Sequence, residues 1–284
     1  APGNHDYFTL RSPYSALHWP ENVHIFRSAA LEAVERPDLG CAVHGAAFTA
    51  PEQAEGFLTG FTAPADGRLH IGLLHGELAP SETRYDPLRR EEIAESGLAY
   101  LALGHVHAGS GLQWEGGTAW AYPGCPEGRG FDELGEKGGL WVTLDDGAIS
   151  VEFVPLARRR YRIVEADVSR AERPEDALLA ALPEDAGADI LRVLLTGESG
   201  VEGLDLAPLA RLLEGRCYSA DLRDMTRVRR DLWSRAEEDT LTGLFLRRMR
   251  ERLAAAGDGD ERAALERAVR FGLAALEHGE EPMA

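Results

Sequence analysis

Short apolar runs separated by polar loops dominate the first half of the chain. Residues 69–74 form one run that ends at His75, and residues 98–103 form another that ends at Gly104. Runs of this length with glycine at their ends predict buried strands rather than helices. Residues 85–96 predict a helix between them, ended by Gly97. This strand–helix–strand alternation predicts an α/β core, and further strands are expected at 120–122, 139–144 and 149–156.

The pattern changes at three consecutive arginines, residues 158–160. A strand (160–168), a helix (174–182) and a second strand (190–195) then predict a small α+β domain. From about residue 224 the pattern becomes helical. Its apolar residues form two stripes, separated at 257–259, which are Leu241, Leu244, Phe245, Met249 and Leu253, then Leu265, Val269, Leu273 and Leu276. We therefore expect three domains, at 1–157, 158–223 and 224–284.

Composition narrows the class of protein. The 284 residues are 44% hydrophobic and 27% charged, as expected for a folded protein. The chain contains no apolar run of about 18 residues, the length that is needed to span a membrane. No signal peptide is visible, and the three widely spaced cysteines argue against a disulfide framework or a cysteine-rich zinc site. Both observations favour the cytoplasm. A net charge of -18 argues against a general nucleic-acid-coating surface but leaves room for a local phosphate-binding groove.

Four of the nine histidines lie in three glycine-bordered motifs. His5 is in GNHD (3–6), His75 is in LLHGE (73–77), and His105 and His107 are in GHVH (104–107). Loops at the ends of strands on one sheet edge assemble sites in α/β folds, and residues i and i+2 of an extended segment point the same way. One such histidine alone is more typical of an ordinary hydrogen-bonded residue. Together with Asn4, whose oxygen suits Mn, Fe or Zn, the three motifs predict a shared metal site.

These motifs, together with the stretch AYPGCPEGRGFDELGEKGGLWVTL (121–144), resemble those of calcineurin-like metallophosphoesterases. Within that superfamily the chain is similar to the SbcD-like nuclease subunits of DNA double-strand-break repair, because the last stretch is typical of that branch. The resemblance covers residues 1–157 well and the remainder loosely. It implies a metallophosphoesterase β-sandwich flanked by helices in 1–157. A small α+β capping domain and a helical C-terminal region would follow.

The resemblance also implies a metal centre with assigned ligands. Asn4, His75 and His105 would bind the second of two divalent ions, most simply Mn²⁺ with Fe, Zn or Mg as alternatives. His107 would bind the first ion. The family also uses an Asp-x-His and a Gly-Asp-x-x-Asp motif before GNHD. Only Ala1 and Pro2 precede Gly3, so we expect those ligands upstream of this chain, and we expect the chain alone to be inactive and to bind metal weakly at most.

Further residues take roles from the same resemblance. His5 would stabilise the transition state or protonate the leaving group, and Asp6 would orient it. Arg158, Arg159 and Arg160 would lie near the cleft and bind substrate.

The expected function is metal-dependent phosphodiester hydrolysis on DNA by a nuclease subunit. Its partners would be DNA, an SbcC-like ATPase docked on the C-terminal helices and a second copy of the subunit, and it would be associated with the nucleoid. Those helices could equally pack against the core. Two alternatives remain open: a phosphodiesterase acting on a small phosphodiester, and a non-catalytic fragment or scaffold that lacks half of the metal site.

Overall fold

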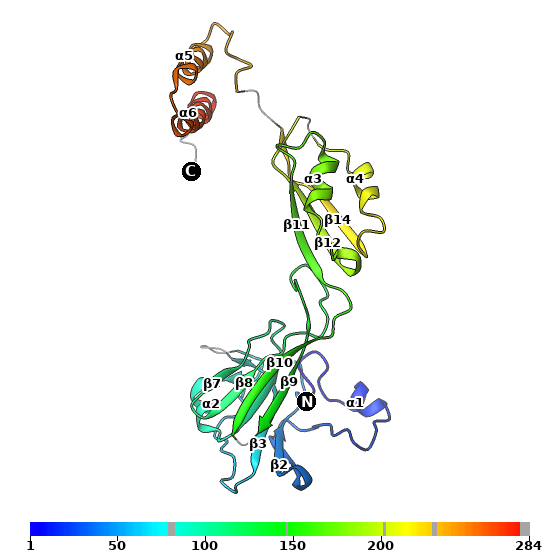
Figure 1. Ribbon diagram of the computed structural model, residues 1–284. Coiled ribbons are helices and arrows are strands. Elements are labelled where there is room, and N and C mark those ends of the chain that lie inside the picture. The colour runs from blue at the N-terminus through cyan, green and yellow to red at the C-terminus, as the bar shows by residue number, and fades with distance from the viewer. Residues whose placement is uncertain (79–82, 146, 201–202, 229–231, 279–284) are drawn as a thin grey trace.

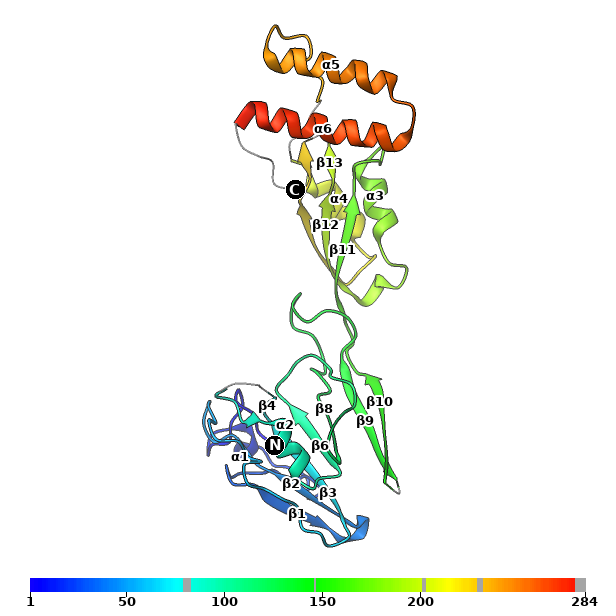
Figure 2. The ribbon, with the colours of Figure 1, turned by 90° about the vertical axis from the view of Figure 1, so that its left-hand side faces the viewer.

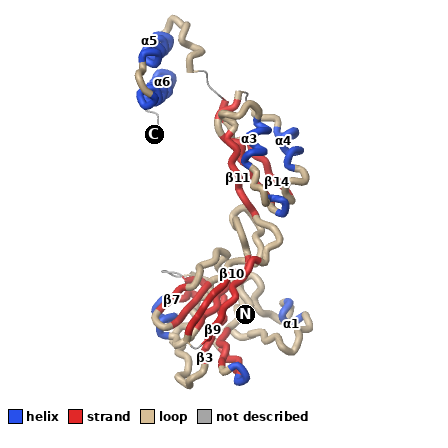
Figure 3. The backbone as a smooth tube through the Cα atoms, viewed as in Figure 1, coloured by secondary structure: helices blue, strands red, loops and turns tan. Residues whose placement is uncertain are grey.

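A computed structural model describes residues 1–78, 83–145, 147–200, 203–228 and 232–278. The fold is mixed α/β, with several separate sheets and helices (Figure 1). Two perpendicular views show three parts following one another along the molecule: the N-terminal sheets, a three-stranded sheet with two helices, and a helical pair (Figure 2). Figure 3 shows that much of the N-terminal part is loop. The chain is loop both before and after the short helix α1 (Pro13–Ala16).

A six-stranded sheet with the order β1-β2-β3-β6-β8-β7 forms the centre of the N-terminal part. Its strands are β1 (Glu32–Arg36), β2 (Cys41–Gly45), β3 (Leu69–His75), β6 (Tyr100–Gly104), β7 (Gln113–Glu115) and β8 (Thr118–Ala121). The four inner strands are parallel to one another, and β1 and β7 are antiparallel at the two edges. The carboxyl ends of the inner strands therefore share one edge of the sheet.

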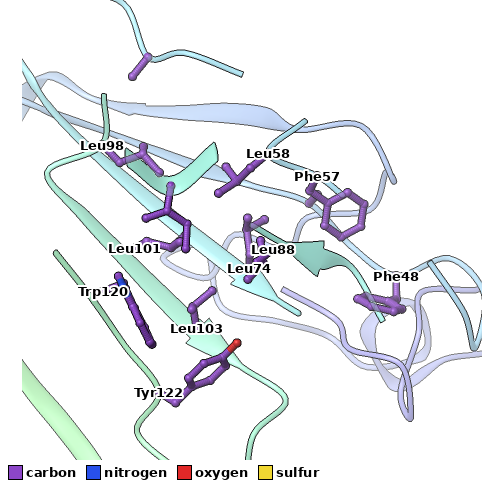
Figure 4. Packing of buried hydrophobic residues seen from close by; sticks show 13 residues of the cluster. Phe48, Phe57, Leu58, Leu74, Leu88, Leu98, Leu101, Leu103, Trp120 and Tyr122 are labelled. Atoms are coloured by element: carbon purple, nitrogen blue, oxygen red, sulfur yellow. The ribbon is translucent and has the colours of Figure 1, made fainter. Parts of the chain in front are cut away.

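Both faces of this sheet are covered by apolar side chains. The hairpin of β9 (Gly138–Asp145) and β10 (Ala148–Pro155) packs its alternate residues, such as Val142, against Tyr100 and Ala121 on one face. Because side chains alternate along a strand, Leu101 and Trp120 lie on the opposite face. There they join the larger buried cluster of Figure 4. Strands buried on both faces explain why the sequence shows continuous apolar runs instead of alternation.

The helix expected at residues 85–96 is wrong in its first half. Helix α2 spans only Arg90–Glu95, and before it β5 (Pro87–Leu88) pairs in parallel with β4 (Glu77–Leu78). Asp86 has a φ of 50°, a left-handed conformation that no helix accepts, and Pro87 has no N–H to donate. Residues 86–88 thus form a turn and a short strand beside β4, and the helix begins only after them.

A three-stranded parallel sheet follows, with two helices on one face. Its elements are β11 (Tyr161–Asp167), α3 (Pro174–Ala181), β12 (Ile190–Thr196), α4 (Leu206–Leu213) and β14 (Ser219–Asp224). Helix α4 and strand β14 were not expected from the sequence. Alternate residues of the strands, among them Leu191, Val193 and Leu195, are fully buried against Leu178 of α3 and Leu209 of α4. A short parallel pair is formed by β13 (Glu198–Ser199), which follows β12, and β15 (Arg227–Val228), which follows β14.

The helical region begins later than expected, with α5 (Leu241–Ala255) and α6 (Gly259–His278). The hydroxyl of Thr240 accepts a hydrogen bond from the backbone N–H of Gly243 and so caps α5. Leu246, Met249 and Leu253 pack against Val269, whereas Leu241 remains 68% exposed, so only part of the expected stripe is buried. Each buried cluster draws on a single stretch of the chain, and the division into three domains stays a prediction. Among the described residues, no helix is both long enough and apolar enough to cross a membrane.

Candidate metal centre

Two of the motif histidines lie side by side at the carboxyl edge of the central sheet. His75 is the last residue of β3, and His105 follows directly after β6. The parallel register pairs His75 with Gly104, so the two imidazole rings lie with their centroids 5.2 Å apart. Gly104 allows this approach, because a Cβ there would lie 3.0 Å from Nδ1 of His75. The predicted convergence of these two strand ends is therefore present in the structure.

The N-terminal motif reaches the same place from a distant part of the sequence. Oδ1 of Asn4 lies 2.9 Å from Nε2 of His75, and Asn4 is only 8% exposed. A side chain at Gly3 would collide with the imidazole, since its Cβ would lie 2.5 Å from Cε1 of His75. Glycine before Asn4 is thus a steric requirement of this contact.

A single cavity of about 580 Å³ contains the third histidine. It is lined by His75, His105 and His107 and by residues 124–129 of the following loop. An extended segment from His105 to His107 is expected from the sequence, but His105 has a φ of 103° and lies outside any strand. The side chains of His105 and His107 nevertheless line the same cavity. The segment at His107 is bound to the loop of residues 124–129 by a hydrogen bond, in which the N–H of Cys125 donates to the carbonyl of His107 at 3.3 Å.

The environment keeps the paired imidazoles neutral. Burial, followed by the neighbouring His105, lowers the pKa of His75 to about 4, and burial lowers the pKa of His105 below its ordinary value. The ring of Phe48 meets the ring of His75 edge-on at 5.6 Å, and Tyr85 lies against His105 at 5.2 Å. Neutral imidazole is the form that binds metal ions, so this surrounding favours a ligand over a charged surface residue.

His5 and Asp6 lie at a neighbouring hollow rather than in the same cavity. A second cavity of about 210 Å³ is lined by these two residues together with Tyr7, Thr9 and Arg11, among others. The Asp6 carboxylate accepts the backbone N–H of Gly3 at 2.9 Å and the hydroxyl of Tyr14. The described residues include no hydrogen bond between Asp6 and His5. Asp6 therefore fixes the loop that carries Asn4 and His5, which differs from the expectation that it orients His5 directly.

The three arginines at 158–160 have different surroundings. Arg160 forms hydrogen-bonded ion pairs with Asp185 and with the buried Asp189, which Arg162 also binds. The guanidinium of Arg159 lies 3.7 Å from the ring centroid of Tyr218. Arg158 is exposed, with no ion pair among the described residues. The structure places the charge of Arg160 inside the three-stranded region, and its predicted part in substrate binding stays a prediction.

The side chains present fit part of a divalent metal site. Two donors that bind one ion at about 2.1 Å and at right angles lie about 3 Å apart, which matches the 2.9 Å between Asn4 and His75. Amide oxygen and neutral imidazole suit Mn, Fe or Zn. Within the described parts of the chain, however, no three His, Cys, Asp or Glu side chains come together to hold an ion. The donors that the described residues bring together at Asn4, His75 and His105 are neutral, with no carboxylate among them.

Glu133, which contacts His107, was not expected from the sequence. Oε1 of Glu133 lies 2.5 Å from Nδ1 of His107, although the two residues are 26 positions apart. The only signal in the sequence was its position within the stretch 121–144, which pointed to the family and not to a contact.

Comparison with known proteins agrees with this chemistry. No family model matches the chain. It is 36% identical over 156 residues to an uncharacterized metallophosphoesterase, YhaO, of Bacillus subtilis, across 53% of this chain and 38% of that protein. It is 32% identical over 89 residues to the DNA double-strand break repair protein Mre11 of Aeropyrum pernix, across 31% of this chain and 22% of that protein.

The chain is similar to metallophosphoesterases. It spans well under half of the length of these two relatives. The similarity to YhaO agrees with the metallophosphoesterase-like motifs of this chain.

Proposed function

We propose that this chain forms part of a metal-dependent phosphodiesterase that cleaves DNA, as the nuclease subunit of an SbcCD-like repair complex. The observation that carries the proposal is the meeting of Asn4, His75 and His105 at the carboxyl edge of the sheet, beside a cavity that also contains His107. The similarity to YhaO supports the reaction class, and the shorter similarity to Mre11 supports DNA as the substrate.

In this proposal Asn4, His75 and His105 hold one divalent ion and His107 holds a second. The chemistry that such ions supply is Lewis-acid neutralisation of the charge that develops on the phosphate. The protein's own part is to keep the donors rigid: Phe48 supports the His75 ring, and Gly3 leaves room for its contact with Asn4. His5, which is exposed, donates a proton to the departing oxygen.

The test is a cleavage assay on the full-length gene product. Labelled linear duplex DNA, single-stranded DNA and bis(p-nitrophenyl) phosphate are each incubated with and without Mn²⁺. We expect Mn²⁺-dependent cleavage of DNA that falls to background in His105→Ala. The control is His18→Ala, which removes an exposed histidine outside the motifs and should cleave as well as the unmodified protein.

The three substrates separate the alternatives. Cleavage of bis(p-nitrophenyl) phosphate without cleavage of DNA would replace the proposal by a phosphodiesterase for small substrates. No cleavage of any substrate, with His105→Ala indistinguishable from the unmodified protein, would contradict both. A non-catalytic scaffold would then be the better description, and the purely neutral donor set is the observation that favours it.

We further propose that the helical pair docks the ATPase partner. The support is the set of apolar side chains that α5 and α6 leave at the surface, with Leu244 49% and Phe271 45% exposed. Co-purification with an SbcC-like ATPase checks this proposal. The double variant Leu244→Glu/Phe271→Glu should lose the ATPase without losing Mn²⁺-dependent cleavage.

A further inference from the structure

The loop after the last motif histidine places a buried carboxylate against that histidine. Glu133 is 9% exposed, and its Oε1 lies 2.5 Å from Nδ1 of His107. Its Oε2 accepts the backbone N–H of Arg129 at 2.7 Å. Its own N–H donates to the carbonyl of Gly130 at 3.1 Å, which closes the turn that carries it. Both carboxylate oxygens and the backbone N–H of Glu133 are thus hydrogen-bonded within the loop or to His107.

The loop is fixed to the His107 segment through its backbone as well. Gly124 has a φ of 84°, and a Cβ there would lie 3.0 Å from the carbonyl oxygen of His107. The N–H of Cys125 donates to the same carbonyl oxygen. His107 is therefore held at two points, by the loop backbone on its carbonyl and by Glu133 on its ring.

The ring contact decides which nitrogen of His107 can bind a ligand. An ionised carboxylate accepts and does not donate, so its neighbour Nδ1 must carry the proton. In a neutral imidazole the other nitrogen, Nε2, then has the free lone pair. A carboxylate behind a histidine in this way fixes both the tautomer and the orientation of metal-binding imidazoles.

We propose that Glu133 is the positioning residue of His107, holding it in the Nδ1–H tautomer with Nε2 free to bind a divalent cation. The inference rests on the proposed function for the role of His107 as a ligand, but its tautomer and its partner are properties of the metal-free protein. Glu133 does not serve as a ligand itself, because both of its oxygens are engaged by the protein and its side chain is buried.

The tautomer is measured directly by long-range ¹H–¹⁵N NMR on the full chain labelled at histidine. Spectra are recorded without metal at pH 8.5, about 2 units above the ordinary imidazole pKa, so that neutral rings predominate. The signals of His107 are those that disappear in His107→Gln. We expect the Nδ1–H tautomer in the unmodified chain. Glu133→Ala should shift His107 to the Nε2–H tautomer that free histidine prefers.

The control is Glu136→Ala, which removes the same charge three residues away from an exposed side chain. It should leave the His107 signals unchanged. Finding His107 of the unmodified chain in the Nε2–H form would overturn the proposal, whatever the variants do. So would an unchanged tautomer in Glu133→Ala. If Glu133→Ala does not fold, the tautomer of the unmodified chain still decides the question.

A second measurement connects the contact to metal binding. In the cleavage assay, Glu133→Ala should raise the Mn²⁺ concentration for half-maximal activity by about 10–100-fold. A merely structural role would lower activity without moving this midpoint. The absence of DNA cleavage in the unmodified protein would defeat the proposed function, while the tautomer result would still stand or fall on its own.

Discussion

Asp86 offers a prediction whose size can be worked from the structure. Its side chain is fully buried, Oδ1 accepts the backbone N–H of Phe57 at 2.6 Å, and Oδ2 has no hydrogen-bond partner among the described residues. Burial, with a smaller contribution from the charge of Glu92, raises the pKa of Asp86 from 3.8 to about 7 against the opposing Phe57 bond. The carboxyl group is therefore protonated in the folded protein at a pH where the unfolded chain has lost that proton.

The sign of the pH dependence follows from this difference. Between about pH 4 and pH 7 the folded state binds one more proton at Asp86 than the unfolded state, so the free energy of unfolding falls as the pH rises. The two pKa values differ by about 3, and at 1.36 kcal/mol per pKa unit the total loss is ~4 kcal/mol. Above pH 7 this contribution is complete and becomes constant.

The variant Asp86→Asn removes the ionisation and keeps an oxygen for Phe57. Asparagine also tolerates the left-handed backbone at this position, where φ is 50°. We expect the free energy of unfolding of Asp86→Asn, relative to the unmodified chain, to increase by about 3 kcal/mol between pH 4.5 and pH 8, since about 1 kcal/mol of the total is already lost below pH 4.5. Comparing the two proteins at each pH cancels the titration of every other group.

Urea unfolding at five pH values, followed by tryptophan fluorescence and far-ultraviolet circular dichroism, measures this difference. The control is Asp132→Asn, which alters an exposed carboxylate and should follow the unmodified chain at every pH. A difference between Asp86→Asn and the unmodified chain that stays constant within about 1 kcal/mol from pH 4.5 to 8 would refute the reasoning, since it would mean that Asp86 ionises equally in both states.

Three further substitutions probe other parts of the molecule. Gly3→Ala forces a methyl group into the ring of His75 and should raise the Mn²⁺ midpoint of cleavage more than about tenfold, with an unchanged circular dichroism spectrum. Arg160→Ala withdraws a partner from the buried carboxylate of Asp189 and should cost about 1–3 kcal/mol in urea unfolding. Leu178→Ala empties a fully buried position of α3 and should cost about 2–5 kcal/mol in urea unfolding, while the Mn²⁺ midpoint of cleavage stays the same.

The strand ends of the central sheet could be predicted from the sequence because their signal is local. The run before His75 is apolar on both faces and stops at a glycine, so its length and its end are both visible in the sequence. Helix α2 was only half predicted, because the apolar pattern of 85–96 does not show that Asp86 adopts a left-handed conformation. The Asp86 carboxylate accepts the N–H of Phe57, which lies 29 residues earlier in the chain, so this contact is not visible in the local pattern.

Some residues of the candidate site were likewise visible in local motifs, and others were not. Asn4, His75 and His105 were found because each lies in a motif whose residue types already indicate metal chemistry. Glu133 was not singled out, since glutamate in a polar loop is ordinary and only the folded loop brings it to His107. Likewise, nothing in three consecutive arginines shows that the third binds Asp189 while the first remains exposed.

The loop that holds His107 also reaches the next part of the protein. Two residues before Glu133, the ring of Phe131 meets the ring of Tyr161 edge-on at 5.1 Å, and two residues after it, the N–H of Gly135 donates to the carbonyl of Tyr161 at 3.0 Å. Tyr161 is the first residue of β11. Residues 131–135 therefore contact both His107 and the first strand of the three-stranded sheet. Force applied to that sheet has a direct mechanical route to the orientation of one imidazole.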